Sequence, residues 1–221
     1  MGEAEWFASE KRILIRSDFY FYGEAASVEL SEIIAKDISE NWNESGGLIL
    51  YRGFWTFVQF EIHGFYEPEI LPETILKNTN PRNNYFRIEV YSGNDISFVD
   101  GIGANTGYFK LDNLLHHSTT AAHEYGHSLG LKHPPSLDIR GIGQPGIMYP
   151  RGTICDPAFQ YDSDARPLQP GGTLNPQFRR VLPSGIDSLR LQRLSYNKEN
   201  FALVGDFTSL FHEKHLPPIS F

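Results

Sequence analysis

Apolar positions along the chain first follow a strand-like pattern and then a helical one. β-branched and aromatic residues dominate residues 12–22, which predicts an opening strand. From Ser27 to about Asn43, apolar residues recur at three- and four-residue steps, which predicts an amphipathic helix with Ser27 as its N-cap. Further strands are expected over residues 48–51, 54–62, 85–91 and 96–99. The chain up to about residue 111 is therefore expected to form a sheet with one helix against it.

The second half of the chain is predicted to be less regular. Residues 118–129 favour a second helix, and Gly130 stands where a left-handed C-terminal turn would end it. Prolines and glycines are frequent between residues 150 and 183, which favours a long ordered loop. A third helix is expected over about 186–196, whereas residues 197–221 show no assignable pattern. We therefore expect one α+β domain over residues 1–221, with an N-terminal subdomain of about 10–133 and an irregular C-terminal subdomain of about 134–221.

Composition narrows the possible classes of protein. With 221 residues, of which 40% are hydrophobic, the chain can bury one substantial core. No apolar run approaches the roughly 18 to 20 residues that a membrane span requires, so no span is predicted. A net charge of −8 disfavours nucleic-acid binding. The N-terminus lacks the pattern of a signal peptide, so the compartment stays unknown: the protein stays in the cell, leaves by a leaderless route, or is part of a longer secreted chain.

The segment HEYGHSLGLKH carries the chemistry. His123 and His127 are four residues apart on a predicted helix, so their imidazoles lie on one face and can share a metal ion. Glu124 lies one step round, outside the ligand set but near enough to accept a proton from a water molecule at the metal. Gly130 permits a sharp turn that brings His133 to the same ion. Three imidazoles and one open position are typical of catalytic zinc, so one Zn²⁺ ion is expected.

This site predicts metal-assisted hydrolysis, and the family resemblance described below implies that the bond is a peptide bond in a peptide or protein substrate. Zinc lowers the pKa of water and polarises a carbonyl, while Glu124 takes the proton from the water and returns it to the leaving amine. Activity is expected to fall below about pH 6, because the imidazole ligands must be unprotonated. An alternative is a non-catalytic binding domain that keeps zinc for structure. Glu124 argues against this alternative, since no structural role requires a glutamate there.

The spacing HExxHxxGxxH resembles the signature of the metzincin zinc peptidases. The later segment GIMYP resembles the methionine turn of the matrix-metalloproteinase-like branch, in which tyrosine and proline follow the methionine directly. By this resemblance, Met148 and Tyr149 support the metal site, and Tyr149 and Pro150 also contact the substrate. Asp187 stands five residues before Gln192 and would tie the last helix to the methionine turn.

The same resemblance implies a fold. It is a twisted, mostly parallel sheet with two helices in the N-terminal subdomain, followed by a smaller irregular subdomain with one helix. Metzincins place a sheet edge just before the active-site helix, where an extended peptide pairs with it. Thr106, Gly107 and Tyr108 are therefore expected to contact the substrate.

Several features depart from the resemblance. Residues 100–120 lack the histidine and aspartate pattern of a second, structural zinc. Pro150 stands where other branches of the family carry a tyrosine ligand, so no such ligand is expected. Cys155 lies after the active-site helix and so cannot serve as the latency cysteine of the family; we expect it to be a small buried hydrophobe. The insert over residues 151–183 is longer than the specificity loop of the family, so the pocket for the residue after the scissile bond cannot be transferred.

The biological role stays open at this stage. Bacterial toxin and effector proteins include small metallopeptidase modules, and a module of that kind would keep the same site. It would have a narrow protein or peptidoglycan target and an inhibitor or immunity protein as partner. The other histidines are weaker candidates. His63, His212 and His215 lack companion ligands, and His116 and His117 precede the second predicted helix, which they are expected to cap or flank.

Overall fold

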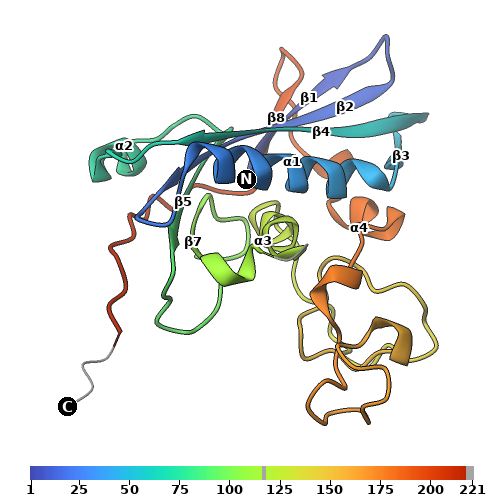
Figure 1. Cartoon of the computed structure of the whole chain (residues 1–221). Coiled ribbons are helices and arrows are strands. Elements are labelled where there is room, and N and C mark those ends of the chain that lie inside the picture. Colours follow the sequence, from blue (N-terminus) through green and yellow to red (C-terminus); the bar gives the residue numbers. More distant parts are fainter. Residues whose placement is uncertain (116–117, 218–221) are drawn as a thin grey trace.

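A mixed sheet of eight strands forms one layer of the molecule, and helices lie against one of its faces (Figure 1). The computed structural model describes residues 1–115 and 118–217. The strands are β1 (Gly2–Phe7), β2 (Arg12–Tyr22), β3 (Leu48–Tyr51), β4 (Phe54–Tyr66), β5 (Asn83–Glu89), β6 (Phe98–Val99), β7 (Thr106–Lys110) and β8 (Phe201–Val204). The helices in the described ranges are α1 (Val28–Glu44), α2 (Pro72–Leu76), α3 (Thr120–Ser128) and α4 (Pro183–Ser188). The predicted α+β class is confirmed.

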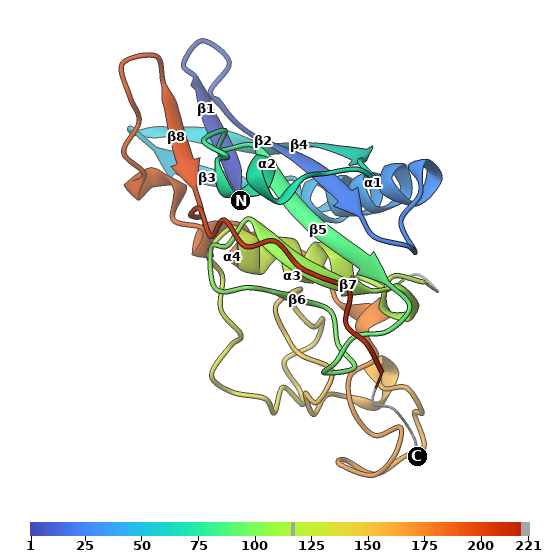
Figure 2. The same cartoon turned by 90° about the vertical axis from the view of Figure 1, so that its left-hand side faces the viewer.

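Strand β2 is the centre of the sheet because three other strands pair with it. The main order is β3-β4-β2-β5-β7-β6, and the four strands β4, β2, β5 and β7 are parallel. Strand β4 pairs with one edge of β2. Along the opposite edge, the first half of β2 pairs antiparallel with β1 and the second half pairs parallel with β5. Strand β1 also pairs with β8, so the last strand of the chain lies beside the first (Figure 2).

Helix α1 forms where the apolar periodicity predicts it. The Ser27 side chain accepts a hydrogen bond from the backbone N–H of Leu30 at 3.1 Å, which confirms Ser27 as the N-cap. Ile34, Ile38 and Trp42 are buried on the face that packs against the sheet and α3. Helix α3 packs against α1 on the side away from the sheet (Figure 1).

Buried aromatic side chains hold α3 in place. The indole N–H of Trp42 donates to the backbone carbonyl of Ala122 at 3.0 Å. The Tyr125 ring lies edge-on to Trp42, with 5.7 Å between ring centroids, and edge-on to Phe19 of β2 at the same distance. The Tyr125 hydroxyl lies 2.8 Å from the hydroxyl of Ser17, which itself donates to the carbonyl of Met1. Helix α3 is therefore fixed to both α1 and the central strand.

The C-terminal part of the chain differs from its predicted elements. The helix expected over 186–196 is wrong in extent: α4 ends at Ser188, Arg190 adopts a left-handed conformation with φ 51°, and a short 3₁₀ turn follows at Leu191–Arg193. The left-handed residue interrupts the helical hydrogen-bond ladder. Strands β1 and β8 and helix α2 were not predicted at all. The end of the segment assigned to the C-terminal subdomain thus returns to the sheet as β8. The long loop expected between residues 150 and 183 is confirmed, with only two short 3₁₀ turns before α4 begins (Figure 1).

The predicted substrate edge is also wrong. Thr106, Gly107 and Tyr108 lie inside β7, which pairs with β5 on one side and β6 on the other. All three residues are buried, so their backbone groups are already used within the sheet. The expectation failed because the short strand β6 folds back antiparallel outside β7. The sheet ends instead at β6.

Two further expectations concern burial and membranes. Cys155 is buried in a small cluster with Ile139 and Leu174, which confirms its interpretation as a buried hydrophobe. Across residues 1–115 and 118–217, every helix is too short or too polar to cross a bilayer.

The bond between α3 and the central strand can be tested by Tyr125→Phe. The substitution keeps the aromatic packing and removes the hydrogen bond to Ser17, so the free energy of unfolding should fall by about 1 kcal/mol. Urea denaturation of the metal-free protein measures this loss. Tyr161→Phe is the matched control because Tyr161 is exposed, and it should change stability by less than about 0.5 kcal/mol. Equal stability of the Tyr125 variant and the wild type would show that the hydroxyl contributes nothing.

Candidate metal centre

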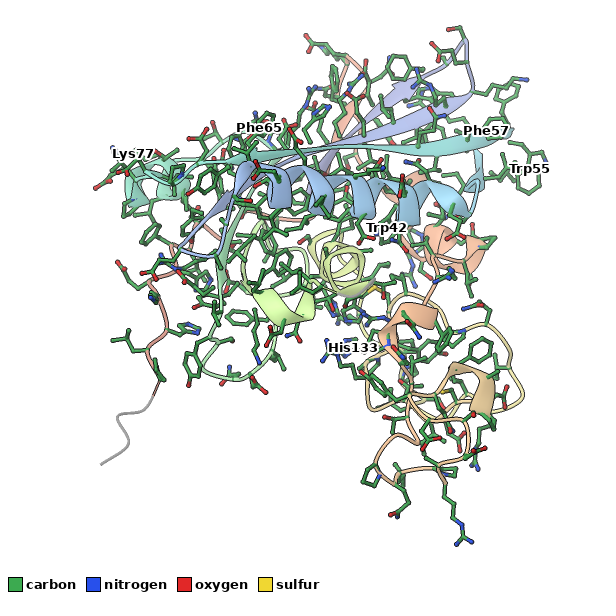
Figure 3. All side chains as sticks on the ribbon, in the orientation of Figure 1. Trp42, Trp55, Phe57, Phe65, Lys77 and His133 are labelled. Atoms are coloured by element: carbon green, nitrogen blue, oxygen red, sulfur yellow. The ribbon has the colours of Figure 1, made fainter. Side chains whose placement is uncertain are left out.

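Three imidazoles converge at the C-terminal end of α3. The Nε2 atom of His133 lies 3.1 Å from the Nε2 of His123 and 3.1 Å from the Nε2 of His127. One ligand atom from each of the three side chains lies within 4.8 Å of the others. His123 is buried, His127 is half-buried and His133 is exposed, so the cluster opens to solvent on the His133 side (Figure 3). The predicted ligand residues are therefore brought together, and the group can hold a metal ion.

Backbone carbonyls determine which nitrogen of each ring is free. His123 Nδ1 lies 2.7 Å from the carbonyl oxygen of Ile147, and His127 Nδ1 lies 2.8 Å from that of Leu131. A carbonyl only accepts, so both Nδ1 atoms must carry the proton. In the neutral rings, the Nε2 lone pairs then face the centre of the cluster. This is the tautomer that a metal requires, held by the outer hydrogen bonds typical of metal-binding histidines.

The end of α3 explains how His133 reaches the cluster. Gly130 has φ 99°, a conformation that residues with a Cβ rarely adopt. The backbone N–H of Leu131 then donates back to the carbonyl of Gly126 at 2.9 Å, which closes the helix. The same reversal points the Leu131 carbonyl at His127 and returns the chain toward α3. Gly130 thus has the structural role that its position predicts.

The segment around Met148 lies directly against α3. Its Ile147 carbonyl holds His123, and Met148 is buried with 7% of its surface exposed. A Cβ atom on Gly126 would lie 2.3 Å from the Met148 sulfur and 3.2 Å from a Trp42 ring carbon. Only glycine at position 126 lets the methionine approach the helix this closely. The methionine is thereby placed beside the ligand helix, outside the group of three ligands.

Glu124 lies in a pocket beside the ligands. A cavity of about 330 Å³ is lined by Glu124 and by the ligands His123 and His133. The glutamate is 7% exposed, and burial raises the pKa of its carboxyl to about 8, although Arg179 and a backbone hydrogen bond with Val99 act in the opposite direction. A divalent cation at the imidazoles would act in the same direction as Arg179 and lower the pKa of Glu124, because it adds positive charge beside the carboxyl.

Arg179 is a site residue that the sequence did not reveal. It lines the same cavity, is 3% exposed, and comes from the irregular loop far along the chain from α3. Its Nε donates to the Thr119 hydroxyl at 2.8 Å, and its Nη1 donates to the Tyr149 carbonyl at 3.2 Å. Burial lowers the pKa of Arg179 to about 10, so it stays charged at neutral pH. In the sequence, Arg179 is one of two adjacent arginines in a proline-rich segment. That segment has no helical or strand periodicity, so nothing in it indicates where the side chain points.

The environment keeps the three histidines neutral. Burial is the main cause that lowers the pKa of His123, His127 and His133, and the positive charge of Arg179 lowers all three further. Protons therefore compete with a metal ion for the Nε2 atoms only at a lower pH than they would for a free imidazole. This direction favours metal binding at neutral pH.

The remaining predicted site residues have mixed outcomes. Pro150 lines the cavity of Glu124, and Tyr149 lines a second cavity of about 610 Å³ on the other side of His133. Asp187 differs from its expected role: its side chain is exposed and forms no hydrogen bond with residues 146–150 in the described structure, whereas the neighbouring Ile186 is buried.

The other histidines are not part of the cluster. His63 contacts Asp18 at 2.9 Å, and His212 contacts Asp100 at 2.9 Å. His215 stacks on Tyr108, and the expected capping residues His116 and His117 lie outside the described residues.

No protein-family model matches the chain, and no curated protein matches it significantly. Function must therefore be inferred from the site itself.

The contact between Gly126 and Met148 predicts the effect of Gly126→Ala. The added methyl group overlaps the sulfur, so the free energy of unfolding should fall by about 1–3 kcal/mol and metal affinity should fall with it. Urea denaturation and competition with a zinc indicator measure the two effects. Gly185→Ala is the control, since a Cβ there meets no atom within 4 Å, and it should cost nothing. Wild-type stability of the Gly126 variant would contradict the close contact, and Met148→Ala in its background should restore part of the loss.

The raised pKa of Glu124 predicts a pH-dependent effect of Glu124→Gln on the metal-free protein. An unfolded glutamate loses its proton near pH 4.5, whereas the folded one keeps it to about pH 8. The wild type therefore loses stability relative to the glutamine variant as pH rises through this window. Chemical denaturation in the presence of a chelator, repeated at several pH values, measures the gap, which is the difference in the free energy of unfolding between the variant and the wild type. The contributions of the histidines cancel in this difference because both proteins contain them. The gap should narrow with zinc present. A gap that stays constant with pH would contradict a buried, protonated carboxyl.

Proposed function

We propose that the protein is a zinc-dependent endopeptidase of the metzincin type. One observation carries the proposal. A single cavity is lined by His123 and His133, two of the three candidate ligands, and also by the carboxyl of Glu124, which is not one of the three. A structural metal site has no need of an open cavity with a separate carboxyl. The three-nitrogen ligand set suits zinc among the common divalent ions.

The protein residues divide the work of hydrolysis between binding and proton transfer. Zinc, when bound, supplies a Lewis acid toward water and the scissile carbonyl. Glu124 accepts a proton from the attacking water and delivers it to the leaving amine, so the carboxyl acts as base and then as acid. Burial raises the pKa of this carboxyl toward neutral pH, which suits a group that must both accept and release a proton. His123 and His127 keep their orientation through the carbonyls of Ile147 and Leu131.

An extended substrate has one available sheet edge near the cavity. Strand β6 is the last strand on that side, and Ile96 and Ser97, directly before it, line the cavity of Glu124. A peptide that pairs with the free edge of β6 would pass the cavity and present its carbonyl to the imidazole cluster. This role replaces the one first assigned to Thr106, Gly107 and Tyr108.

The proposal is tested by cleavage of a quenched-fluorescent peptide library. Zinc-loaded wild type should cleave members of the library, and 1,10-phenanthroline should abolish the cleavage. Glu124→Gln should lower kcat by at least about 10²-fold, because a positioned general base contributes this much or more. The variant should still bind one equivalent of zinc, measured by atomic emission after desalting.

Three results would separate this function from its alternatives. Zinc loss in the Glu124 variant would make the glutamate a ligand or a structural residue. Full activity of that variant would exclude it as the base. A zinc-loaded wild type that cleaves no library member, casein or muropeptide would contradict a general peptidase and favour the binding-domain interpretation.

A further inference from the structure

Arg179 is a buried cation with unfilled hydrogen-bonding capacity. Its guanidinium has five N–H donors, and the structure pairs Nε with Thr119 and Nη1 with the Tyr149 carbonyl. Among residues 1–115 and 118–217, Nη2 has no hydrogen-bond partner and no carboxylate forms an ion pair with the guanidinium. Burying a charge is costly unless an opposite charge or enough hydrogen bonds offset it. Both hydrogen-bond partners of Arg179 are neutral, and Glu124 attracts the guanidinium without forming an ion pair with it, so the cost of burial is only partly offset in the protein alone.

The surroundings of Arg179 favour an anionic ligand. The cavity that it lines also contains Arg151, whose side chain donates to Asn113 at 3.0 Å. Glu124 is the only acidic residue that lines this cavity, and it does not form an ion pair with either arginine in the described structure. Two cations facing one carboxyl form a local positive region in a chain whose net charge is −8. A planar guanidinium with free N–H groups binds a carboxylate with two parallel hydrogen bonds.

The role of Glu124 decides which part of a substrate enters this cavity. Under the proposed function, Glu124 hands its proton to the amine that leaves. The residue that carries this amine must therefore lie against Glu124, and so in the cavity that Glu124 shares with Arg179. A volume of about 330 Å³ lies at the small end of ligand pockets and suits one side chain.

We propose that Arg179, assisted by Arg151, makes the protein selective for a carboxylate on the residue directly after the scissile bond. This inference rests on the proposed function and names its substrate class. The carboxylate has two sources: the side chain of an internal aspartate or glutamate, or the C-terminal carboxylate when that residue is the last of the peptide. The first source makes the protein an acid-selective endopeptidase, and the second makes it a carboxypeptidase.

The test compares peptides that differ only at this residue. One set carries Glu, Gln or Leu there within a longer peptide, and a second set ends at this residue with a free or amidated C-terminus. The ratio of kcat/KM for Glu over Gln isolates the charge, since the two side chains have nearly the same shape. A charge-assisted hydrogen bond predicts a ratio of about 10 to 100 for the wild type. A preference seen only for the peptides of the second set that have a free C-terminus would identify the C-terminal carboxylate as the source.

Arg179→Met and Arg180→Met form a matched pair of variants. The ratio should fall to about 1–3 in Arg179→Met, because the cation that distinguishes the two peptides is gone. Comparing two peptides within one variant cancels any general loss of activity. Arg180 is adjacent and pairs with Glu44 at 3.8 Å outside this cavity, so Arg180→Met should keep the wild-type ratio. If Arg179→Met does not fold, the more exposed Arg151→Gln should still lower the ratio by about threefold.

Binding measurements separate this inference from the proposed function. Isothermal titration of zinc-loaded Glu124→Gln with the uncleaved Glu and Gln peptides should give at least about tenfold tighter binding of the Glu peptide. Cleavage of all peptides at equal rates would overturn the carboxylate preference and leave the peptidase function intact. Tighter binding of the Glu peptide without any cleavage by the wild type would keep the carboxylate site and overturn the peptidase function. Equal affinities with no cleavage would overturn both.

Discussion

The candidate site depends on two hydrogen bonds from imidazole Nδ1 atoms to backbone carbonyls. His123 is held by the Ile147 carbonyl and His127 by the Leu131 carbonyl. With both Nδ1 protons committed, the Nε2 lone pairs face His133 at 3.1 Å, an arrangement that repels until a cation lies between them. The carbonyls come from the turn around Met148 and from the reversal after Gly130. Helix, turn and reversed chain therefore form one unit, and none of them can shift without moving a ligand.

The rest of the fold serves to keep this unit rigid. Helix α3 has only nine residues, too short to be stable alone, so its position must come from packing. Tyr125 and Trp42 supply that packing, and each adds one hydrogen bond to a neighbouring element. Gly126 removes the side chain that would keep Met148 away from the helix. The tight packing beneath the three histidines contrasts with the side of the cluster where His133 is exposed.

Sequence reasoning succeeded where a local period or spacing carries the information. The strand at 12–22, the helix after Ser27 and the convergence of three histidines each depend on residues close together in the chain. It failed where the structure depends on distant partners. Strands β1 and β8 pair across about two hundred residues, and β7 is internal only because β6 folds back outside it. Arg179 lies in a loop without periodicity, so nothing local indicates that its side chain reaches Glu124.

Glu124 and Arg179 share one cavity without forming an ion pair, and this separation is chemically useful. A direct pair would offset the burial of both charges, but it would also lower the pKa of the carboxyl and occupy the oxygens that must receive a proton. Thr119 and the Tyr149 carbonyl hold the guanidinium apart. At this distance, Arg179 still lowers the pKa of Glu124, while burial raises it to about 8. Under the proposed function, the carboxyl is thus free for proton transfer and the guanidinium is free for a ligand, so that one small cavity would provide both catalysis and selectivity.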